Sequence, residues 1–150
     1  MKFLLAIAFA FLAVTALGQI TEIDGKYYTT DSELYSGTHT EYHPDSTIKV
    51  VMNFTDGQKD GQFQFFYPNG ELKEIQSYKL NKKHGEWIRY NENGKTIAIA
   101  NFKNGIKDGK WFIADKKGRK IYEMNYVNGE KAGTWVRYDS VGNVVDKKSY

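Results

Sequence analysis

Hydrophobic and polar positions along the chain recur with a period of 24 residues. Two glycines and two aromatic positions mark each unit. The first glycine series is Gly61, Gly85, Gly109 and Gly133, and the second is Gly70, Gly94, Gly118 and Gly142. The aromatic residue two positions after the first glycine is Phe63, Trp87, Trp111 and Trp135, and a closing aromatic stands at Phe54, Tyr78, Phe102, Tyr126 and Tyr150. Self-similarity at a fixed period of this length indicates a repeat architecture.

Each unit reads as two strands separated by two tight turns. Residues 86–90 are rich in aromatic and β-branched side chains, as strands are. Asn91-Glu92-Asn93-Gly94 suits a type I turn closed by a left-handed glycine. A returning strand over 95–102 leads to a second turn at Asn104-Gly105, where Asn81 replaces the glycine in another copy. Asparagine tolerates positive φ, so that substitution keeps the turn.

We therefore predict an all-β fold of tandem hairpins stacked into an elongated, twisted antiparallel sheet, with no helix in the mature chain. A single hairpin is marginally stable in water, whereas stacked copies bury their aromatic rows against one another. The aromatic rows are interpreted as packing, with a ladder for sugars or lipids as the alternative. Ala114 stands where the other copies carry an aromatic residue, which weakens that unit's packing.

The repeat domain is predicted to span 36–150, with about four to five copies. The first copy is degenerate, because His39 replaces the aromatic residue and Ser46 replaces the turn glycine. The last copy stops at Tyr150, which leaves an open strand edge able to pair with another chain. Residues 19–35 are expected to form a leader strand with loops.

Residues 1–18 have the pattern of a secretory signal peptide: a basic start, an apolar run over 3–14 and small residues at Ala16 and Gly18. An uncleaved anchor is the alternative, although the run is short of the roughly 20 residues of a bilayer span. The chain has no cysteine, which excludes a lipoprotein anchor, disulfides and thiolate metal sites. We expect export to the periplasm, the cell surface or the medium.

The charge distribution is asymmetric. The formal net charge is +3, but residues 19–70 carry −5 and residues 71–150 carry +7. One basic run at a predicted turn tip is a candidate contact for anionic lipid or polysaccharide: Lys116, Lys117, Arg119 and Lys120. The alternative is an ordinary solvated lysine-rich surface. Nucleic acid is not an expected partner after export.

Catalytic and metal-binding patterns are weak in this sequence. His39 and His43 with Glu41 between them could form a metal site, but exposed histidines explain them better without a helix to align them. No glycine-rich phosphate loop is present, and no recurring carboxylate pair indicates acid–base chemistry. We expect no enzymatic activity and no cofactor.

The motif Gly-x-Trp-x-x-Tyr-x-x-x-Gly over 85–94, repeated from Gly133 to Tyr138, resembles the variant MORN repeat of bacterial YwqK-type proteins. The Asn-Gly link over 128–133 is also similar, and the resemblance covers roughly 37–150. It implies stacked hairpins acting as scaffolds, dimerisation surfaces or lipid contacts, and for YwqK-type members an antitoxin role. Choline- and glucan-binding repeats are similar too, and imply aromatic cages for ligands. The chain lacks their Trp-Tyr-Tyr run.

The function predicted from the sequence is a non-enzymatic, exported protein-interaction scaffold that binds a protein partner or a second copy of itself. The alternatives are a surface-binding module for anionic lipid or polysaccharide, and an antitoxin-like binder.

Overall fold

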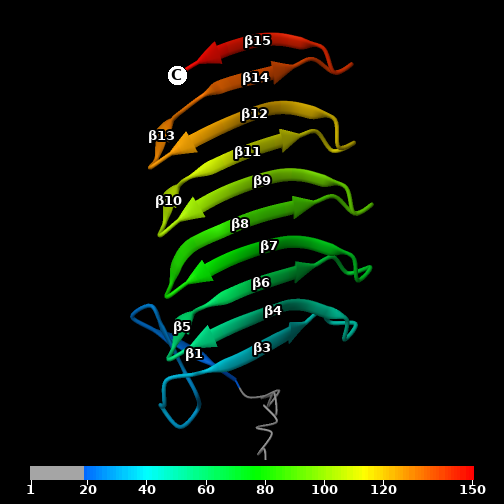
Figure 1. Cartoon of the computed structure of the whole chain (residues 1–150). Helices are drawn as coiled ribbons and strands as arrows, with labels where there is room; N and C mark the ends of the chain where they lie inside the picture. Colours follow the sequence, from blue (N-terminus) through cyan, green and yellow to red (C-terminus); the bar gives the residue numbers. More distant parts are fainter. Residues whose placement is uncertain (1–18) are drawn as a thin grey trace, which may run out of the picture.

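A computed structural model describes residues 19–150, and the predicted signal peptide at 1–18 lies outside the described residues. The described chain contains strands and turns and no helix, so it also holds no helix able to cross a membrane. Figure 1 shows one large antiparallel sheet in which the chain runs back and forth from β3 to β15. The predicted all-β stack of hairpins is confirmed.

Thirteen strands make the large sheet, and a separate two-stranded hairpin precedes it. The hairpin consists of β1 (Thr21–Ile23) and β2 (Lys26–Tyr28). The long strands are β3 (Gly37–Tyr42), β4 (Ile48–Thr55), β6 (Gly61–Phe66), β7 (Leu72–Lys79), β8 (Lys82–Tyr90), β9 (Thr96–Lys103), β11 (Gly109–Ala114), β12 (Lys120–Val127), β14 (Thr134–Tyr138) and β15 (Val144–Ser149). Three short strands flank the turns: β5 (Gln58–Lys59), β10 (Ile106–Lys107) and β13 (Glu130–Lys131).

Both kinds of turn take the predicted conformations. Gly94 closes the longer turn with φ +71°, and its N–H donates to the carbonyl of Asn91 at 2.9 Å. The shorter turn has positive φ at both positions, +51° at Asn104 and +88° at Gly105. Asn81 adopts φ +66° in the copy that lacks this glycine, as its residue type predicts.

The first glycine series lies directly across from the closing aromatic of the next strand. Gly85 pairs with Phe102, and Gly109 pairs with Tyr126. Both glycines have positive φ, +84° and +102°. A ring therefore lies beside backbone that carries no side chain, which lets the aromatic residues pack closely.

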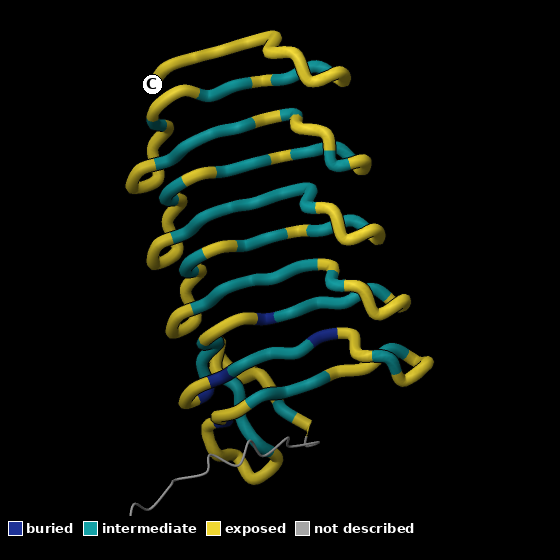
Figure 2. Tube along the Cα trace, turned by 45° about the vertical axis from the view of Figure 1, so that its right-hand side comes forward, coloured by how far each residue is buried: buried dark blue, intermediate teal, exposed yellow. Residues whose placement is uncertain are grey.

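The sheet is a single layer, and its core is correspondingly small. Within 19–150 the buried hydrophobic residues are Tyr35, Val50, Phe54 and Phe63, all near the N-terminal end. Figure 2 shows that the long strands from β7 to β14 are half-buried over much of their length and that β15 is exposed throughout. Neither face has a second layer packed over its full length.

The segment before β3 caps the N-terminal end of this layer. The centroid of the Tyr27 ring lies 4.5 Å from that of Phe54, and the backbone N–H of Tyr27 donates to the carbonyl of Gly57. Gly57 in turn donates to Tyr35, and a Cβ at position 57 would sit 2.9 Å from the Tyr27 carbonyl oxygen. The β1–β2 hairpin thus docks on the first turn of the sheet by backbone contacts that require a glycine.

Candidate binding surfaces

One face of the sheet carries an unbroken row of aromatic rings, which we call the ladder face. Successive ring centroids lie 5.0–5.7 Å apart and the planes meet at 54–69°. The row consists of Tyr35, Phe54, Phe63, Tyr78, Trp87, Phe102, Trp111, Tyr126, Trp135 and Tyr150. Tilted and edge-to-face contacts at this distance are the favoured geometry for aromatic pairs. The geometry agrees with the packing interpretation of these residues.

Each tryptophan is also fixed by a hydrogen bond to the backbone. The indole Nε1 of Trp87 donates to the Ser77 carbonyl at 2.8 Å, and Trp135 donates to Asn125 at 3.0 Å. The polar edge of the ring is therefore satisfied within the sheet. The rings are held in place before any ligand arrives.

Four lysines lie over this ladder at the period of the repeat: Lys59, Lys83, Lys107 and Lys131. The Lys83 Nζ is 4.2 Å from the centre of the Trp87 ring and 5.0 Å from that of Phe102. Lys107 and Lys131 repeat this geometry over the following units. An ammonium within about 6 Å of a ring face is attracted by the ring's electrons. We call these four residues the lysine row.

The lysine row was missed in reading the sequence, although a signal for it exists. Each lysine stands two residues before a first-series glycine, so the units begin Lys-x-Gly-x-(Phe/Trp). The 24-residue spacing is as strict as that of the glycines. Because lysine is normally interpreted as a solvated surface residue and the chain has many lysines, the periodic ones are easily overlooked.

The first copy departs from this arrangement. Tyr35 stands one period before Lys59, and its ring packs against Phe54 at 5.7 Å. His39 occupies the aromatic position, and its buried Nδ1 has no hydrogen-bond partner among residues 19–150. The candidate metal residues do not converge: His43 Nε2 contacts the Phe66 carbonyl at 3.3 Å, and no group of three potential ligands is found in the described chain.

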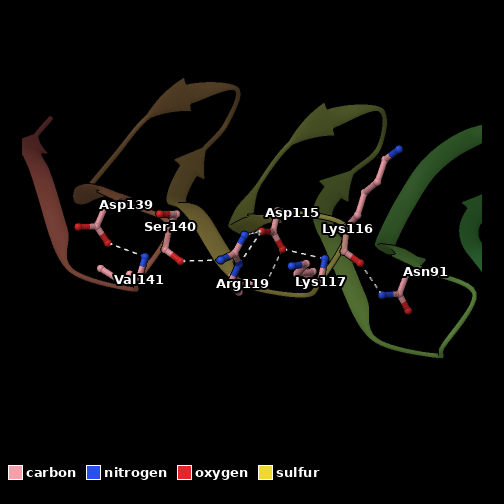
Figure 3. A network of polar contacts seen from close by, with 8 residues as sticks. All are labelled: Asn91, Asp115, Lys116, Lys117, Arg119, Asp139, Ser140 and Val141. Carbon is pink, nitrogen blue, oxygen red and sulfur yellow. Dashed lines mark hydrogen bonds and ion pairs between the residues drawn. The ribbon is translucent and has the colours of Figure 1, made fainter.

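The predicted basic run lies on the turn after β11, where it forms part of a network between turns (Figure 3). Arg119 pairs with Asp115 at 2.7 Å and also donates to the Ser140 carbonyl of the next turn at 2.9 Å. The Lys116 carbonyl accepts a hydrogen bond from the Asn91 side-chain amide of the preceding turn at 2.8 Å. Figure 3 shows the Lys116 side chain extending away from these contacts. The turns are thus tied to their neighbours.

The network also perturbs titration at the turns. The backbone N–H of Arg119 and its guanidinium lower the pKa of Asp115. In the equivalent place of the next turn, the backbone N–H of Asn143 lowers the pKa of Asp139. Both carboxylates act as acceptors for turn N–H groups, which explains why Asp or Asn opens each of these turns.

The last member of the basic run, Lys120, lies on the face opposite the ladder. Its Nζ is 2.6 Å from Glu123, and the Tyr138 hydroxyl donates to the same carboxylate. The ion pair with Lys120, followed by the Tyr138 hydroxyl, lowers the pKa of Glu123. The four basic residues therefore do not form one surface. Arg119 and Lys120 are paired with carboxylates, and Lys120 lies on a different surface from the turn tip.

This opposite face carries an apolar strip along the middle of the sheet. Directly paired residues form it: Ile75, Ile88, Ile99 and Phe112. All four are half-buried. Around Ile99 and Phe112 lies a shallow hollow of about 680 Å³, whose rim includes Glu86, Lys110, Lys120 and Glu123. We call this surface the Phe112 hollow.

Comparison with known families agrees with this architecture. Residues 59–80 and 83–104 match the model of the MORN repeat variant family, and the two matched copies begin at Lys59 and Lys83. No curated protein sequence matches the chain. These two copies are similar to variant MORN repeats, and the other copies continue in the same 24-residue register. MORN repeats are non-enzymatic modules that generally bind proteins or lipids.

Proposed function

We propose that this MORN-repeat chain is an exported, non-enzymatic scaffold that docks a protein partner on the Phe112 hollow. On this proposal it is an exported relative of the YwqK-type repeat proteins. If the partner is a toxin, the chain acts as an antitoxin-like binder. Export rests on the signal-peptide pattern of residues 1–18.

The observation that supports docking is the uncovered apolar strip of the single-layer sheet. Ile99 and Phe112 form an apolar centre, and charged side chains of both signs surround them. Protein interfaces have this anatomy, with an apolar core, a polar rim and an aromatic anchor near the centre. The rim carboxylate of Glu123 is already held in place by Lys120, so little ordering is needed when a partner binds.

The proposal is tested by crosslinking the tagged mature protein in the envelope of the cells that make it, followed by mass spectrometry of the purified complex. Wild-type protein is expected to yield one partner in near-stoichiometric amount. Phe112→Asp should abolish its recovery, because a charge in the centre of an apolar contact remains without a partner.

The chain offers a matched control in the next residue. Ile113 belongs to the same strand, is 39% exposed and pairs with Ala98 and Tyr122 on the ladder face. Ile113→Asp adds the same charge to the opposite side of the sheet and should leave partner recovery unchanged. Equal recovery with both variants, or equal loss, would contradict docking at the Phe112 hollow.

A further inference from the structure

The lysine row lies over aromatic rings and has no carboxylate partner among residues 19–150. The ion pairs within residues 19–150 involve Lys49, Arg89, Arg119 and Lys120. None involves the lysine row, of which Lys83, Lys107 and Lys131 are exposed. Four positive charges thus line one side of the ladder face without neutralisation by the protein.

The spacing of these charges follows from the fold. Each repeat contributes two strands, and neighbouring strands lie about 4.8 Å apart, so the lysines recur at about 9.6 Å. Lys59 to Lys131 therefore spans roughly 29 Å in three steps. The rings below hold each ammonium at a fixed place, since Lys107 lies 4.6 Å from the centre of Trp111 and 4.7 Å from that of Tyr126.

A complementary ligand is a linear chain with one negative charge about every 10 Å. Two strand spacings come to about 10 Å, and an extended disaccharide unit is of comparable length. We propose that the lysine row binds an acidic polysaccharide that carries one carboxylate per disaccharide, laid along the ladder perpendicular to the strands. Each carboxylate then accepts from one lysine ammonium, a charge-assisted hydrogen bond.

The ladder face favours a narrow chain over an anionic bilayer. Nearer the other end of the strands, this face carries the carboxylates of Glu74 and Asp146, each directly across from an arginine. Each of these arginine–carboxylate pairs has no net charge, so a flat anionic surface would gain little from them, whereas a single polysaccharide chain would contact the lysine row alone. Half-buried rings such as Trp111 and the 45% exposed Tyr150 border the row and offer apolar contact to sugar rings.

This site uses the face opposite the Phe112 hollow and does not depend on the proposed protein docking. A chain that bound polysaccharide on one face and a protein on the other would hold that protein at an acidic polysaccharide matrix.

The test measures binding of hyaluronan octasaccharide, which has four disaccharides with one carboxylate each, by titration calorimetry at low salt. Lys107→Gln/Lys131→Gln should weaken binding by about 25-fold, or about fivefold per lysine, the effect expected of one lysine at an anionic surface. Lys116→Gln/Lys117→Gln makes the same change in net charge at the turn tip and should leave the affinity within about twofold of wild type, a bound set by the screening of distant surface charges. Glutamine keeps an aliphatic stem with an uncharged polar end, and melting curves of both variants check that the sheet remains folded.

Chain length gives a second measurement. Affinity should rise from the tetrasaccharide to the octasaccharide as one carboxylate is added for each lysine, and should rise little beyond it. The same octasaccharide with its carboxylates reduced to alcohols should not bind.

Other results would overturn the proposal. They are equal losses in the two double variants, binding of the reduced octasaccharide, or no dependence on length. The proposal would also fail if phosphatidylserine vesicles or a poly-glutamate peptide bound more tightly than the octasaccharide with the same dependence on Lys107 and Lys131.

Discussion

The indole Nε1–H of Trp111 donates a hydrogen bond to the carbonyl oxygen of Asn101, ten residues earlier in the chain, at 3.1 Å. The same ring packs against Phe102 on one side and Tyr126 on the other. Because Trp87 and Trp135 repeat this hydrogen bond, each of the three tryptophan-bearing repeats attaches its largest ring to the backbone of a preceding strand. The stack therefore gains both apolar contact and a fixed orientation from one residue type.

Substitution of Trp111 separates these two contributions. Trp111→Phe retains a stacked ring and loses the hydrogen bond, and should lower the free energy of unfolding by about 1–2 kcal/mol. Trp111→Ala interrupts the ladder and should cost about 3 kcal/mol or more. Urea unfolding followed by circular dichroism measures both values. Equal losses in the two variants would show that the hydrogen bond, rather than the ring contact, dominates.

Gly94 tests the conformation of the longer turn. Its φ is +71°, and a Cβ added there would meet nothing within 4 Å, so any cost of substitution comes from the backbone. Gly94→Val should destabilise the protein by about 1–3 kcal/mol, because a β-branched residue disfavours positive φ. Gly94→Asn should cost clearly less. Melting temperatures of the two variants make the comparison, and an unchanged value for the valine variant would contradict the turn assignment.

Leu80 occupies a left-handed position that the other copies give to Asp56, Asn104 and Asn128. Its φ is +48° and the side chain is 55% exposed, so it bears backbone strain with little burial in return. Leu80→Asn should raise the free energy of unfolding by about 1 kcal/mol. Asn104→Leu is the reverse change in an equivalent turn and should lower it similarly. Thermal unfolding measures whether each variant is more or less stable than wild type. A destabilised Leu80→Asn protein would mean that the leucine side chain makes a stabilising contact.

The fold followed from the sequence because turns and rings repeat. Glycine at positive φ, as at Gly94, and asparagine at Asn104 are chemical requirements of tight turns, so their spacing predicted the hairpins. The aromatic residues at a fixed spacing predicted that the rings of stacked copies pack against one another. Ala114 broke the pattern without interrupting the sheet, because backbone pairing across β11 and β12 continues through it.

The surfaces were harder to predict, since they depend on contacts between copies. Lys107 lies over Trp111 because Lys107 pairs with Phe102 across the strand, and its sequence alone does not distinguish it from a solvated lysine. Arg119 and Lys120 are neighbours in the chain, but the structure pairs them with different carboxylates on different surfaces. The cap formed by Tyr27 has no counterpart in the repeat, so periodicity gave no information about it.

The Glu123 carboxylate should make stability depend on pH. Lys120 and then Tyr138 lower its pKa below the ordinary value of 4.5. A carboxyl whose folded-state pKa is lowered stabilises the folded protein above its unfolded-state pKa, and this contribution is lost as pH falls through the folded-state pKa. Wild-type protein should therefore melt at a higher temperature than Glu123→Gln at pH 7, and the difference should shrink towards pH 3.

Comparing the two proteins at each pH removes the effect of other carboxylates with lowered pKa, such as Asp115 and Asp139, because both proteins contain them. Lys120→Met provides the reciprocal test, since it removes the principal cause of the shift and should reduce the same pH-dependent difference. A melting-temperature difference between wild type and Glu123→Gln that stayed constant from pH 7 to pH 3 would show that the carboxylate acts through its shape and hydrogen bonds, and that its charge contributes nothing to stability.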